Sequence, residues 1–208
     1  MSATQPPLTV PRRRLAAAER RQQILNSSAR LFIAHGFEAV SMADLAADLQ
    51  ISRPAIYSYF PSTESVLEAL LDERLGQLWN HLERLISGTQ AVSRQPPVGV
   101  YAALFDFLLT ERDSLQLLHS GGGPTFQERR AAFLSELGRR LEVRFPSIRR
   151  RAHQMTVVTH LLDSLAFHAV QQGLSDASGL AQTLDTFMRG GVQLLAEEGE
   201  EHAGPVKG

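Results

Sequence analysis

The stretch that decides the fold is residues 41–60, which read Ser41-Met-Ala-Asp-Leu-Ala-Ala-Asp-Leu-Gln50-Ile-Ser-Arg-Pro-Ala-Ile-Tyr-Ser-Tyr-Phe60. Serine hydroxyls cap helix starts, and Asp44 stands three residues after Ser41, the spacing of a capping box. Ser52 can cap a second helix in the same way. Pro54 fits the first turn of that helix, where a backbone N–H is not needed. The stretch therefore predicts two short helices joined by a tight turn.

The apolar residues of this stretch predict that the two helices pack on each other as a helix-turn-helix. Ala46 is small at the point where the second helix must cross the first. The residues that can fill the space between the helices are Leu45, Leu49, Ile51 and Ile56. The turn opens at Gln50, where a helix-turn-helix usually takes a left-handed backbone and often has Gly. A side chain at that position costs about 1 kcal/mol, which such a motif can tolerate.

The exposed side of the second helix carries residues that suit the major groove of DNA. Arg53, at its amino-terminal end, can donate two hydrogen bonds to O6 and N7 of a guanine. Pro54 and Ala55 can touch a thymine methyl group. Tyr57 and Tyr59 can donate to phosphate oxygens, and Tyr57 also reaches toward a base.

Contacts to the DNA backbone are expected on both sides of this helix. Ser41 and Ser52, with the free N–H groups of their helix ends, can bind phosphates. Arg12, Arg13 and Arg14 would form a flexible arm over the backbone or into the minor groove. Residues 1–60 hold seven arginines against four acidic residues, a net charge of +3, whereas the remainder carries −4. A basic end on a nearly neutral chain is what a nucleic-acid-binding protein needs.

Composition places the chain among ordinary globular proteins, with 43% hydrophobic and 21% charged residues in a length of 208. No apolar run approaches the roughly 18 residues of a membrane span. The absence of cysteine excludes disulfides and thiolate metal sites. Residues 1–11 lack the apolar core of a signal peptide. We therefore expect a cytoplasmic protein without a membrane partner.

Residues 20–70 resemble the DNA-binding domain of the TetR (tetracycline repressor) family. The residues that carry the resemblance are Ile24, Ala29, Leu31-Phe32, Gly36-Phe37, Ser41, Leu45-Ala46, Ile51-Ser52, Ile56-Tyr57, Tyr59-Phe60, Ser62, Glu64 and Leu67. The chain departs from the family pattern at Gln50 and at Thr63, where the family usually has Lys. Thr63 stays among the expected DNA contacts, but one phosphate contact is lost and affinity should depend more on the arginine arm.

Helical periodicity continues along the rest of the chain, without the alternation of β-strands. We expect an all-α fold of about nine helices. The second would start at residue 41 and the third after residue 52. The other seven would cover residues 16–35, 62–86, 98–111, 114–119, 125–145, 147–172 and 178–197. The seventh would start at a Thr125 cap, with Glu128 in capping-box position. The divisions are a disordered basic arm (1–15), the helix-turn-helix domain (16–61), a helical ligand-binding and dimerisation domain (62–197) and a disordered acidic tail (198–208).

The resemblance implies a ligand cavity within the fifth to seventh helices. Candidates for its lining are Trp79, Leu82, Phe105, Phe107, Leu109, Leu118, His119, Phe126, Phe133, Met155 and His160. Aromatic and apolar residues at helical spacing equally describe an ordinary core. The histidines lack a paired metal-binding spacing, so we expect no metal and no cofactor. Gly121-Gly122-Gly123 lacks the surroundings of a phosphate loop and is predicted to be a flexible connector beside the cavity.

The last two helices are expected to form a four-helix bundle with those of a second copy. Residues 160–170 are apolar almost all round, so this helix must be buried on several sides. Gly190-Gly191 allows another helix to approach closely. The interface candidates are Leu161, Leu165, His168, Leu184, Phe187 and Gly191.

These features predict a homodimeric, ligand-responsive transcriptional regulator, most simply a repressor that leaves a palindromic operator when a small-molecule effector binds. The alternative is a helical ligand-binding or interaction module without a DNA role. No nucleophile motif and no acid–base cluster points to an enzyme.

Overall fold

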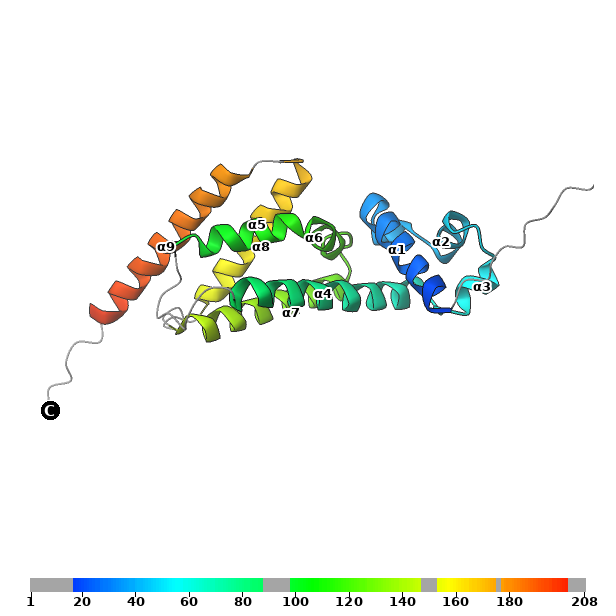
Figure 1. The fold of residues 1–208 in the computed structure, drawn as a ribbon, viewed down its shortest axis with the longest axis horizontal. Coiled ribbons are helices and arrows are strands. Elements are labelled where there is room, and N and C mark those ends of the chain that lie inside the picture. The colour runs from blue at the N-terminus through cyan, green and yellow to red at the C-terminus, as the bar shows by residue number, and fades with distance from the viewer. Residues whose placement is uncertain (1–16, 88–97, 147–152, 175–176, 202–208) are drawn as a thin grey trace, which may run out of the picture.

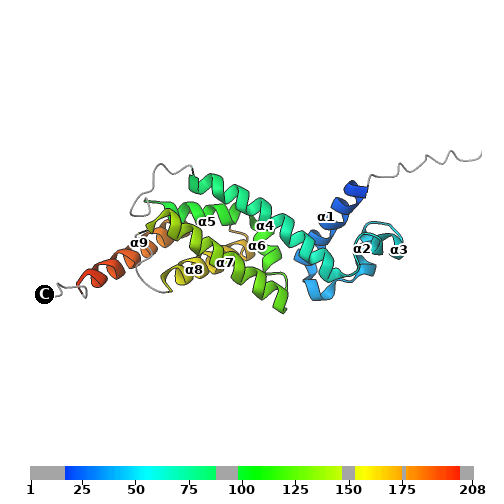
Figure 2. The same cartoon turned by 90° about the horizontal axis from the view of Figure 1, so that it is seen from below.

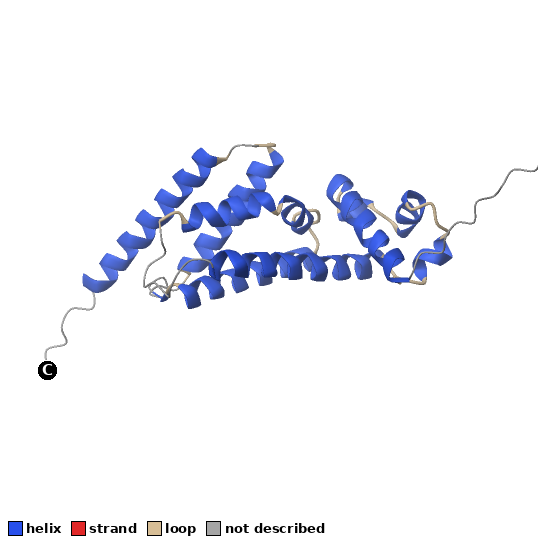
Figure 3. Cartoon of the chain, in the orientation of Figure 1, coloured by secondary structure: helices blue, strands red, loops and turns tan. Residues whose placement is uncertain are grey.

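The computed structural model describes residues 17–87, 98–146, 153–174 and 177–201, and within these ranges every regular element is helical (Figure 3). The elements are α1 (Ala17–His35), a 3₁₀ turn η1 (Phe37–Ala39), α2 (Met42–Asp48), α3 (Arg53–Tyr57), α4 (Thr63–Ser87), α5 (Val100–Thr110), α6 (Arg112–Leu118), α7 (Pro124–Arg144), α8 (Gln154–Gln171) and α9 (Ser178–Glu201). The expected all-α fold is confirmed.

The molecule is elongated, with α1 to α3 at one end and α5 to α9 at the other (Figures 1 and 2). The small domain of α1 to α3 is built around the fully buried side chains of Ile24, Phe32, Leu45 and Ile56. Burial of each such side chain contributes about 1.5–3 kcal/mol, which offsets the small size of this unit.

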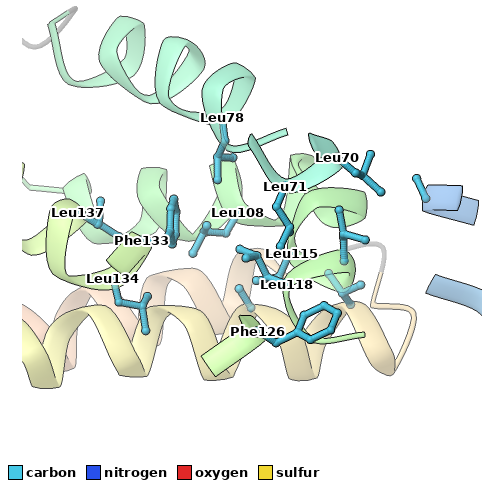
Figure 4. Packing of buried hydrophobic residues seen from close by; sticks show 14 of the residues in the cluster. Leu70, Leu71, Leu78, Leu108, Leu115, Leu118, Phe126, Phe133, Leu134 and Leu137 are labelled. Carbon is cyan, nitrogen blue, oxygen red and sulfur yellow. The ribbon is translucent and has the colours of Figure 1, made fainter. Parts of the chain in front are cut away.

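The long helix α4 extends from the small domain along the larger one and contacts both α1 and α6 (Figure 1). Its first half packs against α1 and also contacts α6. Leu67 and Leu71 are buried there, and Leu78 and Leu82 continue the buried face. These leucines form a continuous buried face along α4 (Figure 4).

The larger domain packs α5 against α8 and α9, and α7 against α8. One buried carboxylate fixes the start of α5, because Asp185 of α9 accepts hydrogen bonds from the amides of Gly99 at 3.1 Å and Tyr101 at 3.1 Å. Arg189, one turn further along α9, donates its Nε to the same side chain at 2.8 Å. Asp185 is only 4% exposed, so this cap ties two helices together inside the protein.

The turn between α6 and α7 attaches the two domains to each other, which corrects the expectation of a flexible connector. The amide of Phe37 donates to the carbonyl of Ser120 at 3.0 Å. The amide of Gly122 donates to a carboxylate oxygen of Glu38 at 3.0 Å. A Cβ on Gly121 would lie 2.3 Å from the buried ring of Phe126. Gly121 is needed here because Phe126 and Glu38 approach this position too closely for a side chain, whereas Gly122 and Gly123 have open space around them.

Helix boundaries differ from the expected ones at three places. The predicted Thr125 cap of α7 is wrong, since Gly123 occupies the N-cap position and makes no side-chain cap. Helix α8 begins at Gln154, after His153 takes a left-handed backbone with φ 70°; residues 147–152, expected to be helical, lie outside the described ranges. Helix α9 continues to Glu201, into the segment expected to be a disordered tail. None of the described helices is long and apolar enough to cross a membrane.

Candidate nucleic-acid interface

The two helices of the decisive stretch start as their sequence predicts. The Ser41 hydroxyl accepts a hydrogen bond from the Asp44 amide at 3.3 Å, and the Asp44 carboxylate accepts one from the Ser41 amide at 2.9 Å. This reciprocal capping box lowers the pKa of Asp44, mainly through the bonds from Ser41, so the carboxylate stays ionised. Ser52 caps α3 by accepting from the Ala55 amide at 3.3 Å.

The turn between α2 and α3 has the geometry expected of a helix-turn-helix. Gln50 adopts a left-handed backbone with φ 52°, as predicted. The amide of Ile51 then donates to the carbonyl of Ala46 at 3.0 Å, which closes the turn. Ala46 and Ile56 are buried between the helices.

Helix α2 is also fastened to α1, so that α3 is held by a rigid scaffold. Asp48, near the end of α2, accepts a hydrogen bond from the Ser27 hydroxyl at 2.5 Å and forms an ion pair with Arg30 at 2.9 Å. Ser27 is buried and Arg30 is exposed, so one bond is shielded from water and the other is not. Together they fix the angle at which α2 supports α3.

The outer side of α3 presents a cation, an apolar edge and a phenol to solvent. Arg53 and Pro54 are exposed, Ala55 is half-buried, and Tyr57 is 52% exposed. Among the described residues, none forms an ion pair with Arg53. An unpaired guanidinium on a fixed helix is free to bind a base edge or a phosphate.

A shallow depression of about 390 Å³ lies between this side of α3 and the starts of α2 and α4. Arg53 and Tyr57 form one wall, and Ser41 and Thr63 lie on the others. The start of α4, a 25-residue helix, also lies at this depression, and the helix dipole there favours an anion; the amides of Ser62 and Ser65 are already bonded to each other's hydroxyls. The depression therefore brings together the donors that would hold a backbone phosphate beside α3.

The structure also refines the expected roles of individual residues. The Ser41 hydroxyl donates to Asp44 at 2.6 Å, so it is already used within the protein and the neighbouring amide of Ala43 is the better phosphate donor. Tyr59 is half-buried and packs against the core, which leaves less of it for DNA than Tyr57. Arg12, Arg13 and Arg14 lie outside the described residues.

One basic residue on this side was missed by the sequence argument. Arg21, exposed in the first turns of α1, places its guanidinium 5.0 Å from the ring centre of Phe60, just after the helix-turn-helix. The arginine-rich run that begins at residue 12 extends to this position and could have drawn attention to it.

Most of the residues expected to line a ligand cavity are packed in the hydrophobic core or against it. Leu82, Phe105 and Phe126 are fully buried within the core, and Leu109 is half-buried. The rings of Trp79 and Phe133 are tilted by 36° with their centres 4.8 Å apart, and the guanidinium of Arg140 lies 4.4 Å from the centre of the Trp79 ring. In Figure 4, Phe126 and Phe133 lie among leucines of several helices.

Two of the cavity candidates, the buried Met155 and the exposed His160, line a surface groove of the larger domain instead. Met155 and His160 line a groove of about 340 Å³ between α7 and α8, next to Gly138. His160 is exposed, and its Nδ1 is 2.7 Å from the carbonyl of Thr156 one turn earlier. The prediction that His160 faces an internal cavity is therefore wrong, because α8 is apolar on most sides and its sequence did not reveal which side faces inward.

Of the six residues expected in the dimer interface, five are at least partly exposed and one is buried inside the chain. Leu161 and Leu165 are half-buried, and His168 and Gly191 are exposed. Phe187 is 68% exposed, which is unusual for a large aromatic side chain. Leu184 is only 4% exposed because it packs inside its own chain, so its assignment to the interface is wrong.

Comparison with known proteins agrees with this geometry. A family model described as bacterial regulatory proteins of the tetR family matches residues 24–70, from α1 to the first turns of α4. Over these residues the chain is similar to the helix-turn-helix domain of TetR-family transcriptional regulators. The TetR family consists of regulators rather than enzymes, in line with the prediction that the chain has no catalytic activity.

Curated helix-turn-helix regulators match about half of this chain or less. The transcriptional activator FasR of Mycolicibacterium smegmatis is 32% identical over 107 residues, which covers 49% of this chain and 45% of FasR. The nicotine-responsive repressor HdnoR of Paenarthrobacter nicotinovorans is 27% identical over 79 residues, 38% of this chain and 41% of HdnoR. The chain thus matches less than half the length of these relatives.

Solved TetR-type structures share the fold over nearly the whole chain. A TetR-like regulator from Rhodococcus aligns with a TM-score of 0.67 and 20% identity, covering 86% of this chain and 99% of that one. A tetR-family regulator from Streptomyces coelicolor aligns with a TM-score of 0.64 and 21% identity, covering 91% and 87%. The larger domain therefore also has the TetR architecture, although its sequence has diverged.

Proposed function

We propose that the protein is a transcriptional repressor that binds a palindromic operator as a homodimer, with α3 in the major groove, and leaves it when a small-molecule effector binds the larger domain. The observation that carries the proposal is the outer side of α3. An unpaired Arg53 and an exposed Tyr57 stand there on a helix whose orientation is fixed by α1 and α2. The similarity of this domain to the helix-turn-helix domain of TetR-family regulators supports the same reading.

Recognition would divide between bases and phosphates. Arg53, in the first turn of α3, would form a bidentate pair with a guanine, worth about 1–3 kcal/mol of discrimination. The depression at the starts of α2 and α4 would hold a phosphate and so position the helix. Arg12, Arg13 and Arg14 would add contacts to the DNA backbone that carry no sequence information.

A second copy is required because one α3 reads only a half-site. Such dimers place their recognition helices about 34–36 Å apart, one turn of B-DNA. The surface for this pairing would come from α8 and α9 and includes apolar residues. Helix α8 contributes an outward stripe with Leu161, Leu165 and His168, and α9 contributes the exposed Phe187 and Gly191. A two-fold axis across this face would give the symmetry of a palindrome.

The effector would act through α4 and the α6–α7 turn, because both connect the two domains. Coupling of about 1–3 kcal/mol between effector and DNA is typical and lowers operator affinity by roughly 5- to 150-fold. HdnoR responds to nicotine, which supports a small-molecule effector for this protein. The similar proteins include both an activator and a repressor, so whether bound protein lowers or raises transcription is decided by experiment.

The test is binding of the purified protein to the DNA upstream of its own gene, measured by fluorescence anisotropy against unrelated DNA of equal length. We expect specific binding, and Arg53→Ala should weaken it by about 1–3 kcal/mol and relax the preference at one base pair. Arg84→Ala, on an exposed residue near the far end of α4, is the matched control and should leave affinity unchanged.

The alternative of a helical ligand-binding module without a DNA role makes the opposite prediction. Such a module would bind the upstream and unrelated fragments equally weakly at low salt, and Arg53→Ala would behave like Arg84→Ala. That outcome would end the proposal. An effect of Arg53→Ala on both fragments alike would keep DNA binding but remove Arg53 from base recognition.

A further inference from the structure

A groove of about 270 Å³ lies where the two domains meet, between α1, α4 and α6. These three helices contact one another there (Figure 1). Seven residues line the groove, four from α1, one from α4 and two from α6. Its volume is close to the lower limit of about 300 Å³ for ligand pockets, so an occupant has to be small.

Two charged side chains of this groove lack a partner. Arg74 of α4 is half-buried and Asp113 of α6 is exposed, and neither forms an ion pair or a side-chain hydrogen bond with any described residue. Glu73, the carboxylate next to Arg74 in the chain, accepts a hydrogen bond from Gln22 at 2.8 Å instead. The groove therefore presents an unpaired cation on one helix and an unpaired anion on another.

The other polar residues of the groove leave this balance of charge unchanged. Arg30 of α1 is paired with Asp48 of α2 at 2.9 Å. Asn26 accepts a hydrogen bond from Gln22 through Oδ1 at 3.4 Å, which leaves its amide group free to donate. The donors of Arg74 and Asn26 suit a carboxylate, and the carboxylate of Asp113 suits an ammonium group.

The remaining lining is apolar and comes from both domains. Ala29 and Ile33 belong to α1, and Leu117 belongs to α6. Ala29 and Leu117 are buried, and Ile33 is half-buried. A ligand bound between the two charges therefore also meets apolar side chains, the combination that is typical of small-molecule sites.

We propose that this groove binds a small zwitterion with an apolar side chain, which is the chemistry of a free α-amino acid. The carboxylate of the ligand pairs with Arg74, its ammonium group pairs with Asp113, and its side chain lies against Ile33 and Leu117. A simple anion or a simple cation would satisfy one of the two charges and leave the other unpaired. The site stands without the proposed function, and only its role as an effector site rests on it.

The position of the groove connects binding to the DNA-binding domain. Helix α1 belongs to that domain and α6 belongs to the larger one, so a ligand that contacts both has its highest affinity for one arrangement of the two helices. A ligand shifts a conformational equilibrium by the difference between its affinities for the two states. Occupancy of the groove should therefore change operator affinity.

The experiment is an NMR titration of the ¹⁵N-labelled full chain at pH 7 with glycine, L-alanine, L-valine, L-leucine and L-phenylalanine. We expect at least one member with an apolar side chain to bind with a Kd below about 1 mM. Glycine should bind at least about tenfold more weakly than that amino acid, because it buries no side chain. The amide signals that shift should centre on the segments of α1, α4 and α6 that line the groove.

The two charges of the ligand are then removed one at a time. The N-acetyl derivative of the best-binding amino acid lacks the ammonium group, and its primary amide lacks the carboxylate. Each should bind at least about tenfold more weakly than the free amino acid, as the loss of a charge-assisted hydrogen bond implies.

Two variants assign each charge of the ligand to its residue. Arg74→Gln should weaken binding of the free amino acid about ten- to hundredfold and leave binding of the primary amide unchanged, because the amide offers no carboxylate. Asp113→Asn should weaken binding of the free amino acid to a similar degree and leave binding of the N-acetyl derivative unchanged. Neither substitution removes an ion pair or a side-chain hydrogen bond, so both variants should fold as wild type does.

Arg84→Gln, further along α4, and Asp106→Asn, on α5, are the matched controls. Both residues are exposed and lie outside the groove, so both variants should bind the amino acids as wild type does.

Three results would overturn the proposal: no amino acid of the series with a Kd below about 1 mM, derivatives that bind as tightly as the free amino acid, or Arg74→Gln and Asp113→Asn variants equal to their controls. None of these measurements uses DNA, so each leaves the DNA-binding proposal standing. Binding of the amino acid without any change in operator affinity would keep the site and remove its role in regulation.

Discussion

A single methyl group added at Gly121 tests whether the α6–α7 turn joins the two domains as the structure shows. A Cβ at this position would lie 2.3 Å from Cε2 and 2.6 Å from Cδ2 of Phe126, and 2.9 Å from a carboxylate oxygen of Glu38. Phe126 is only 1% exposed and also packs against Phe37, with ring centres 5.4 Å apart. The ring cannot swing away into solvent.

The cost of Gly121→Ala follows from these distances. Ordinary contact begins near 3.4 Å, so the Phe126 ring must move by about 1 Å within a packed core. Overpacking of this kind costs about 1–3 kcal/mol. Displacing Glu38 also weakens its bond to the Gly122 amide, worth about 0.5–1.5 kcal/mol. We expect the free energy of unfolding to fall by about 2–4 kcal/mol, and Tm to fall by roughly 4–16 °C for a chain of this size.

The assay is urea unfolding followed by circular dichroism, and by fluorescence of Trp79, the one tryptophan in the sequence. Gly122→Ala is the matched control, because its Cβ would meet nothing within 4 Å and its backbone is not left-handed. The control should leave stability unchanged or raise it by up to about 1 kcal/mol. Equal midpoints for the two variants would refute the packing described at this turn.

Three further predictions concern the larger domain. Leu165→Glu or Phe187→Glu should yield monomers in sedimentation velocity that bind DNA poorly, because each puts a charge on the proposed interface; a persistent dimer would contradict that assignment. Asp185→Asn should lower the free energy of unfolding by about 1–3 kcal/mol, since buried amides of α5 lose a charged acceptor; urea midpoints equal to wild type would show that α5 does not depend on this cap. Tyr101→Phe should leave stability unchanged or raise it by up to about 1 kcal/mol, because the Tyr101 hydroxyl is buried without a partner among the described residues and burial, with the nearby Asp185, raises its pKa to about 12. A clear loss in the same urea assay would reveal a partner for that hydroxyl.

Features that depend on local geometry could be predicted from the sequence. Ser41, Asp44 and Ser52 cap their helices as expected, because a cap needs only residues three positions apart. Gln50 takes the left-handed backbone that the turn demands, whatever its side chain. The small domain follows from such rules, since most of its contacts lie within a few turns of chain.

Features that depend on which side of a helix faces the core could not be read in this way. Helix α8 is apolar nearly all round, so the sequence did not show that His160 faces outward while Asp163 is buried. On α9, Leu184 and Phe187 looked equivalent, yet one packs inside the chain and the other is exposed.

By itself, therefore, the amino-acid sequence determined the helical class, the helix-turn-helix and the residues that α3 presents. The tertiary structure alone decided that Gly121 lies against Phe126 and that His119 of the α6–α7 turn contacts both Arg130 of α7 and Asp163 of α8. The physical reason is that capping and turn energies are local and belong to short segments. The partner of a buried side chain is set by the packing of helices distant in the chain, and a helix with several apolar sides can satisfy that packing in more than one rotation.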